Sequence, residues 1–271
     1  CFGRESVKVY DLFPFFNELP LLDLRMAELK PVVDVFGLVE LPVTFTDIPK
    51  PLYYAETGRQ DVRSYVPGAY PSGPHPTVDW FQRAQLGKLL YDADPDDVVM
   101  LSDVDEIPNR DVVRQYIDEG TDYPVSCRMK LYYHRVDLFD PTVWLGTVIC
   151  RRKNLGDEPE MQRLRSDRWH FLQLVNAGWH FSWLGNGEAI KTKLAAVDIP
   201  RENAIYGAHG IQEPPSDAVW LQECYEKGKD LFQRGSPRLR VPIIPGVNQP
   251  HEIAAWLEKY PQYGAVDHVA Y

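Results

Sequence analysis

The sequence has no long hydrophobic run, and this absence removes one class of protein from consideration. None of its uncharged apolar runs approaches the roughly 18 residues that a helix needs to cross a bilayer. No signal-peptide pattern opens the sequence, and because it begins at Cys1 rather than Met we expect a trimmed chain. We therefore expect no membrane-spanning segment within these 271 residues.

Positive charge is also scarce, because 29 Lys and Arg residues face 39 Asp and Glu, which gives a formal net charge of −10. No stripe of Lys and Arg stands out, and affinity for phosphate backbones comes largely from clustered cations. Nucleic acid is therefore not expected as a partner. The four cysteines lack C-x-x-C spacing, which argues against a structural zinc site. An acidic chain that binds an anion needs a local cation, and a divalent metal ion would serve.

The first half of the sequence alternates between apolar runs and stretches of helical spacing. Strands are expected at residues 7–13, 32–41, 64–66 and 97–102, and helices at residues 20–30, 79–91 and 111–119. Such an alternation predicts an α/β fold with a mostly parallel central sheet flanked by helices. Ligands of such sheets gather at the carboxyl ends of the strands, where Glu40 and an acidic run after residue 102 are expected.

The second half is less regular. Two longer strands, expected at residues 125–137 and 142–152, would be antiparallel neighbours, and helices are expected at 188–197 and 252–259. We expect residues 1–200 to form a catalytic domain. Residues 201–271 are expected to form an irregular C-terminal extension that packs on the same domain.

The run D-V-D-E-I-P at 103–108 follows directly after an apolar strand. If the backbone stays extended, Asp103 and Asp105 project to the same side, because side chains alternate along a strand. Two carboxylates on one side repel unless a cation lies between them, and Mg²⁺ or Mn²⁺ prefers such oxygen ligands. An acidic, solvated turn that precedes a helix would give the same pattern.

A second run, G-W-H-F-S-W at 178–183, places a histidine between two tryptophans and is followed by G-N-G at 185–187. A glycine loop that opens a helix presents free N–H groups to a phosphate, and Lys191 and Lys193 one turn later would add positive charge. His180 is a candidate metal ligand or phosphate donor, although a lone histidine is more often a packed one. The tryptophans are more often core than sugar platform.

Taken together, these segments resemble glycosyltransferase family 17. The matching stretches occur in order between about residues 8 and 195. They are V-Y-D at 9–11, N-E-L at 17–19, L-L-D-L-R-M-A-E-L at 21–29, V-D-V-F at 33–36 with Glu40, K-P-L at 50–52, the runs at 103–108 and 178–183, and then Glu188 and Lys191.

The resemblance implies a GT-A-like Rossmann-type fold, a UDP-GlcNAc donor, Mn²⁺ (or Mg²⁺) and transfer to a glycan acceptor with inversion at the anomeric carbon. Carried over by position, Asp103 and Asp105 are the expected metal pair beside the donor's diphosphate, and His180 is a third ligand. Glu40 would contact the nucleoside. The candidates for contacts with phosphate or with Glu40 are Arg25 and Arg83, for which an ordinary salt bridge is an equal alternative.

An inverting transfer needs a general base that takes the proton of the acceptor hydroxyl. Glu188 is the first candidate and Glu106 the second, although an acid at a helix N-terminus is also stabilised by the helix dipole. Two other functions fit parts of the pattern: a metal-dependent phosphoesterase that uses the acidic run, and a non-catalytic carbohydrate-binding protein suggested by 7 Trp and 15 Tyr.

Overall fold

The computed structural model describes residues 7–71, 77–156, 164–197, 216–233 and 238–265. The strands are β1 Val9–Phe15, β2 Val35–Glu40, β3 Arg63–Tyr65, β4 Val98–Leu101, β5 Glu106–Pro108, β6 Val125–Tyr133, β7 Leu138–Arg151, β8 Leu172–Leu174, β9 Gly178–Ser182 and β10 Leu239–Arg240. The helices are α1 Leu19–Leu29, α2 Tyr53–Glu56, α3 Thr77–Ala84, the 3₁₀ segment η1 Gln85–Leu90, α4 Arg110–Asp118, α6 Gly187–Ala196, α8 Ala218–Lys227 and α9 Ile253–Lys259.

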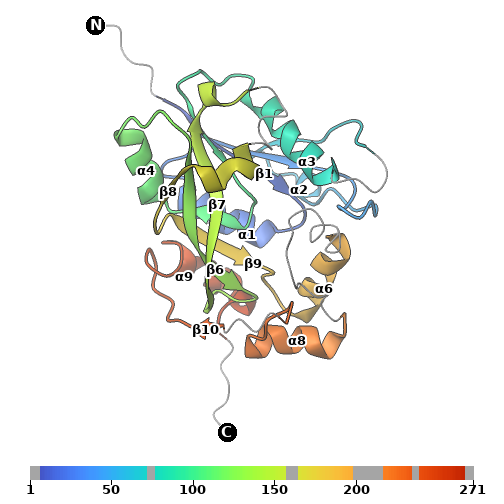
Figure 1. The fold of residues 1–271 in the computed structure, drawn as a ribbon. Helices are drawn as coiled ribbons and strands as arrows, with labels where there is room; N and C mark the ends of the chain where they lie inside the picture. Colours follow the sequence, from blue (N-terminus) through green and yellow to red (C-terminus); the bar gives the residue numbers. More distant parts are fainter. Residues whose placement is uncertain (1–6, 72–76, 157–163, 198–215, 234–237, 266–271) are drawn as a thin grey trace, which may run out of the picture.

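One sheet runs through the centre of the molecule, with helices on both sides (Figure 1). Its strand order is β3-β2-β1-β4-β7-β6-β9-β5, with β10 on β7 and β8 on β6. The first four strands in this order pair in parallel, whereas β7 runs antiparallel to both β4 and β6. The predicted α/β fold with a central sheet and flanking helices is therefore confirmed, as is the antiparallel neighbourhood of the two longer strands.

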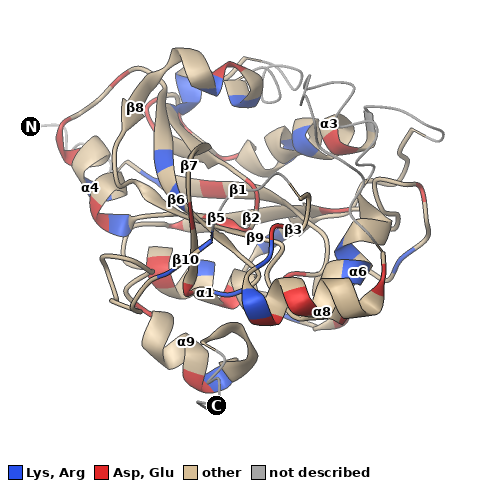
Figure 2. Ribbon diagram, turned by 60° about the horizontal axis from the view of Figure 1, so that its bottom comes forward, with Lys and Arg blue, Asp and Glu red and all other residues tan. Residues whose placement is uncertain are grey.

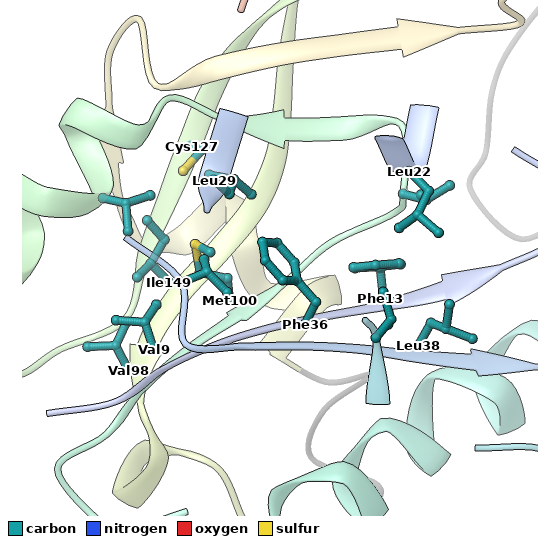
Figure 3. Packing of buried hydrophobic residues seen from close by; sticks show 14 of the residues in the cluster. Val9, Phe13, Leu22, Leu29, Phe36, Leu38, Val98, Met100, Cys127 and Ile149 are labelled. Atoms are coloured by element: carbon teal, nitrogen blue, oxygen red, sulfur yellow. The ribbon is translucent and has the colours of Figure 1, made fainter. Parts of the chain in front are cut away.

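Alternate residues of the central strands pack against different layers, because side chains alternate between the two faces of a sheet. One face packs against α1 and α4 through a cluster shown in Figure 3, which includes Val9, Phe13, Leu22, Leu29, Phe36, Leu38, Val98, Met100, Cys127 and Ile149. The other face packs against η1 and includes Tyr10, Leu12, Val39, Leu86, Leu89, Val99 and Leu101. Burial on both faces explains why these strands are almost continuously apolar.

The first strand does not end before Pro14, as the sequence suggested, but continues to Phe15. The ladder between β1 and β2 extends to the pair Phe15 and Glu40, whereas the ladder between β1 and β4 ends at Leu12. Beyond Leu12 the β4 side of β1 therefore has no ladder partner. A residue without an N–H is tolerated at such an edge.

The described part of the C-terminal segment packs on the sheet and on α1. The indole Nε1 of Trp256 in α9 donates to the carbonyl of Pro20 at 2.6 Å, and β10 pairs with β7. Helix α8 lies beside α6, where Gly187 N donates to Gln222 Oε1 (Figure 1). The helix expected at 252–259 is confirmed as α9. None of the described helices combines the length and apolarity needed to span a membrane.

Candidate functional site

The acidic run after β4 forms a tight turn rather than an extended strand. The backbone N–H of Glu106 donates to the carbonyl of Asp103 at 3.0 Å, and regular strand structure resumes only at Glu106. The expectation that Asp103 and Asp105 share one side of an extended backbone is therefore wrong. Instead, the turn gives each carboxylate its own set of neighbours.

The two motifs of the sequence, 103–108 and 178–183, are neighbours in space. Strand β5 pairs antiparallel with β9, which sets Glu106 opposite His180 and Ile107 opposite Trp179. The backbone N–H of Phe181 also donates to the carbonyl of Asp105 at 2.9 Å. The pairing brings His180 to the acidic turn, as the carry-over from the family expected.

Asp105 lies between a lysine and a histidine. Its Oδ2 is 3.0 Å from Lys193 Nζ, and its Oδ1 is 3.6 Å from His180 Nε2. Burial alone would raise the pKa of the Asp105 carboxyl, but the neighbouring Lys193 and His180 lower it well below its usual value. Burial alone would likewise lower the pKa of Lys193, but Asp105 and Glu18 raise it. The lysine is therefore a cation at neutral pH.

The imidazole ring of His180 packs against the ring of a tryptophan. The Trp144 ring lies 4.4 Å from the His180 ring between centroids, at an interplanar angle of 33°. The buried Nδ1 of His180 has no hydrogen-bond partner among the described residues. A buried polar atom without a hydrogen bond costs free energy, and most such atoms in proteins have a partner. The described residues therefore leave the hydrogen bonding of the His180 ring incomplete.

Asp103 contacts two arginines. Arg83 Nη1 of α3 lies 2.6 Å from Asp103 Oδ1, and Arg165 Nη2 lies 3.2 Å from Asp103 Oδ2. Burial alone would raise the pKa of the Asp103 carboxyl, but these two guanidinium groups lower it below its usual value. Arg83 also pairs with Asp79 at 2.9 Å, so basic and acidic residues lie side by side on α3 (Figure 2).

Glu106 is fully buried and both of its carboxylate oxygens are engaged. Oε1 accepts from Trp144 Nε1 at 2.8 Å and from Arg165 Nη2 at 2.5 Å, and Oε2 accepts from the backbone N–H of Asp103 at 3.0 Å. A general base must reach the acceptor hydroxyl. The structure instead gives Glu106 the contacts of a counter-ion that holds Arg165 and the turn together.

Two other residues that were candidates for contacts with the nucleotide-sugar donor form ion pairs within the protein. Arg25 is fully buried beneath the turn and pairs with Asp11 at 2.6 Å. Glu40 does end β2, but its carboxylate pairs with Lys50 Nζ at 3.1 Å and accepts from Tyr54 N at 3.1 Å. Burial raises the pKa of Glu40 against the opposing effect of Lys50. Arg25 and Glu40 therefore do not pair with each other.

Glu188 and Lys191 do not lie in the cluster around the turn. Both are exposed on α6, the helix that carries Lys193 to Asp105. Each residue of an α-helix turns the chain by roughly 100°, so Glu188 lies about 140° and Lys191 about 160° around the helix from Lys193. Of the three, only Lys193 is placed to meet an anion at the turn.

This placement makes a direct prediction for the first base candidate. We expect Glu188→Gln to keep turnover within about twofold of the parent chain, whereas loss of a general base costs about 10²- to 10⁴-fold. Steady-state kinetics with saturating donor and metal measures the difference. A hundredfold lower kcat with unchanged donor affinity would contradict the placement and restore Glu188 as the base.

Three residues of the site were missed by sequence reasoning. Arg165 comes from a segment without clear periodicity, Trp144 from the middle of β7, and Asp79 from the start of α3. Arg165 and Trp144 both donate to Glu106 Oε1, and Arg165 also donates to the carbonyl of Gly146 in β7. Of these three residues, only Asp79 could have been found from the sequence, because a residue four positions before Arg83 lies next to it on a helix.

The three expected metal ligands do not converge into one group. No set of three His, Cys, Asp or Glu side chains within the described residues is arranged to hold a metal ion. Asp105 and His180 do lie together, whereas Asp103 is paired with Arg83 and Arg165.

An α/β sheet with a charged cluster after its fourth strand is typical of proteins that bind their ligands at the carboxyl ends of the strands. The family model described as Glycosyltransferase family 17 matches residues 3–197, and the chain belongs to this family. The resemblance inferred from the motifs is thereby confirmed.

Curated relatives are β-1,4-mannosyl-glycoprotein 4-β-N-acetylglucosaminyltransferases. The one from Rattus norvegicus is 27% identical over 253 residues, covering 78% of this chain and 46% of its own. The one from Homo sapiens is 27% identical over 229 residues, covering 68% of this chain and 43% of its own. The chain thus spans less than half the length of these relatives.

The solved structures that match this chain superpose on it only poorly. Glucosyl-3-phosphoglycerate synthase of Mycobacterium tuberculosis overlays with a TM-score of 0.39 at 14% identity, covering 92% of both chains. A putative nucleotide-diphospho-sugar transferase of Desulfovibrio desulfuricans G20 overlays with a TM-score of 0.38 at 9% identity, covering 74% of this chain and 96% of its own. Nothing about the site is inferred from overlays this loose.

Proposed function

We propose that the chain is an inverting, metal-dependent glycosyltransferase that moves GlcNAc from UDP-GlcNAc to a hydroxyl group of a glycan. Membership of glycosyltransferase family 17 and the names of the curated relatives support the reaction and the sugar. The observation that carries the proposal is that β5 pairs with β9, which brings His180 to the acidic turn, and that Arg83 and Lys193 contact the carboxylates of this turn.

The accessible members of this cluster suit a diphosphate. The side chains of Asp103, Lys193 and Arg83 are 31%, 25% and 14% exposed, whereas Arg165 and Glu106 are nearly sealed. Arg83 and Lys193 are therefore the cations that a donor entering at the turn would meet. Their charges would offset the negative charge that develops on the leaving diphosphate in the transition state.

A divalent cation would take Asp105 and His180 as its protein ligands, and the donor's diphosphate would supply further oxygens. The carboxylate oxygen and the imidazole nitrogen are 3.6 Å apart, and Mn²⁺ accepts such mixed oxygen and nitrogen ligands. Asp103 would be a further ligand if Arg83 turned toward the diphosphate. When bound, the ion would supply Lewis-acid stabilisation of the leaving group. Trp144 would keep the His180 ring in place through the tilted contact between the two rings.

Release of UDP from UDP-GlcNAc tests the proposal. We expect Mn²⁺-dependent UDP release in the presence of a glycan with a free mannose hydroxyl, and its loss when EDTA removes the metal. Phosphate release from p-nitrophenyl phosphate under the same conditions is the comparison. Hydrolysis of the phosphate ester without UDP release would favour a phosphoesterase, and glycan binding without either reaction would favour a binding protein.

A further inference from the structure

Arg25 is buried to 0% exposure at the point where α1 crosses beneath the acidic turn. Its Nε and Nη2 form a two-pronged pair with the Asp11 carboxylate, both at 2.6 Å. Nη2 also donates to Ser102 Oγ at 2.5 Å. These three contacts fasten the side chain to β1 and to the end of β4.

The remaining guanidinium nitrogen of Arg25 holds the backbone of the turn itself. Nη1 donates to the carbonyl of Asp103 at 3.0 Å and to that of Glu106 at 2.7 Å, with the Val104 carbonyl further away at 3.4 Å. An arginine has five N–H donors. Asp11 takes two, Ser102 one, and the turn carbonyls the other two, so no donor is left for a phosphate.

The sheet geometry explains why these partners meet. Asp11 lies on the same face of β1 as Val9 and Phe13, the face that packs against α1. Ser102 follows Val98 and Met100 in the same alternation after β4. The guanidinium also lies 4.6 Å from the centre of the Phe13 ring. The α1 face of the sheet thus presents a carboxylate and a hydroxyl to Arg25 at its carboxyl end.

We propose that Arg25 is a positioning residue that sets the conformation of the Asp103–Glu106 turn, and through it the metal affinity of Asp105. The inference rests on the proposed metal-dependent function. Arg25 holds the carbonyls of Asp103 and Glu106, whereas the carboxylates of Asp103 and Asp105 are contacted by other cations, Arg83 and Lys193. Arg25 therefore supports the backbone of the turn and does not contact the phosphate of the nucleotide sugar, which was one of the roles that the family resemblance suggested.

Lysine cannot replace this arginine geometrically, although it keeps the charge. A guanidinium offers five donors in a planar fork, whereas an ammonium group offers three from a single point. Arg25→Lys would therefore keep a cation beside Asp11 but release at least one turn carbonyl. Supports of this kind typically change metal affinity by about 10- to 100-fold when they are altered.

The test is direct Mn²⁺ titration in the presence of UDP, followed by the electron paramagnetic resonance signal of free Mn²⁺. We expect Arg25→Lys to weaken Mn²⁺ binding by about tenfold or more. The Mn²⁺ concentration for half-maximal UDP release should rise by a similar factor, with kcat at saturating metal much less affected. Ser102→Ala, a milder change, provides the same readout if Arg25→Lys does not fold.

Arg135→Lys is the matched control. Arg135 is also fully buried, forms a fork with Asp137 at 2.9 and 3.1 Å, and donates to the carbonyls of Tyr225 and Glu226 in α8. It does not contact the turn. Both lysine variants should lower the melting temperature, but only Arg25→Lys should lower Mn²⁺ affinity.

The outcomes separate this inference from the proposed function. If the parent chain binds Mn²⁺ and UDP but Arg25→Lys and Ser102→Ala bind Mn²⁺ equally well, the positioning role is overturned and the glycosyltransferase proposal stands. If the two lysine variants weaken Mn²⁺ binding alike, the effect is general destabilisation, which also overturns it. If the parent chain binds no Mn²⁺ with UDP, the metal-dependent function itself fails.

Discussion

Asp105→Asn is expected to reduce kcat/KM for sugar transfer by about three orders of magnitude. Lewis-acid stabilisation of a leaving group supplies several kcal/mol, and each ~1.4 kcal/mol corresponds to a factor of ten in rate. The asparagine keeps the shape of the side chain but removes the charge beside His180 and Lys193. The measurement is UDP release at several Mn²⁺ concentrations.

The fold should survive this substitution, because Lys193 keeps a second carboxylate, Glu18, at 3.7 Å. Asp122→Asn serves as the control, since Asp122 is 62% exposed and pairs with Lys153, which also pairs with Asp96 at the opposite end of β4 from the turn. Its activity should equal that of the parent chain. Full activity of Asp105→Asn in the presence of a chelator would remove the metal from the mechanism.

Glu106→Ala is expected to destabilise the protein by about 3–5 kcal/mol, the usual cost of removing one partner of a buried ion pair. The change would leave the Arg165 guanidinium without its 2.5 Å partner, and the Trp144 indole and the Asp103 N–H without an acceptor. For a chain of this size the loss corresponds to a fall in melting temperature of about 10 °C. Thermal unfolding followed by circular dichroism measures it.

Glu252→Ala is the comparison, because Glu252 also pairs with an arginine, Arg110 at 3.1 Å, but is 42% exposed. Surface pairs contribute about 0–1 kcal/mol, so its melting temperature should hardly change. If Glu106→Ala melts like the parent chain yet has lost turnover, Glu106 acts as the base and not as the counter-ion of Arg165.

The parallel half of the fold was predictable because its signals are local. Apolar runs and helical spacing marked β1, β2, β4, α1 and α4 to within a few residues. The short strands β5, β8 and β10 were not predicted, since two or three residues carry no periodicity and form strands only through their partners. Pro14 misled the prediction because proline excludes central pairing, and the sequence did not show that one side of β1 lacks a partner there.

The site was predictable as a location but not as a set of contacts. The motifs marked Asp105 and His180 as neighbours, and Arg83 and Lys193 as nearby cations. The role of Arg25 was not predictable, because its partners are mainly backbone carbonyls, which are present at every residue. Glu188 was the first base candidate because it lies beside the glycine loop, and Glu106, within the acidic run, was the second. The sequence shows neither that Glu106 is buried in an ion pair with Arg165 nor that Glu188 lies on the exposed side of α6, away from Lys193.

The packing of α9 has a consequence for where the protein can be shortened. The family match ends at residue 197, yet Trp256 and Ile253 cover Leu21 and Leu24 on the outer side of α1. A fragment that stopped at residue 197 would expose this apolar surface to water and invite aggregation. Because α1 also carries Arg25, which donates to carbonyls of the acidic turn, a segment beyond the family match supports the helix that contacts the turn.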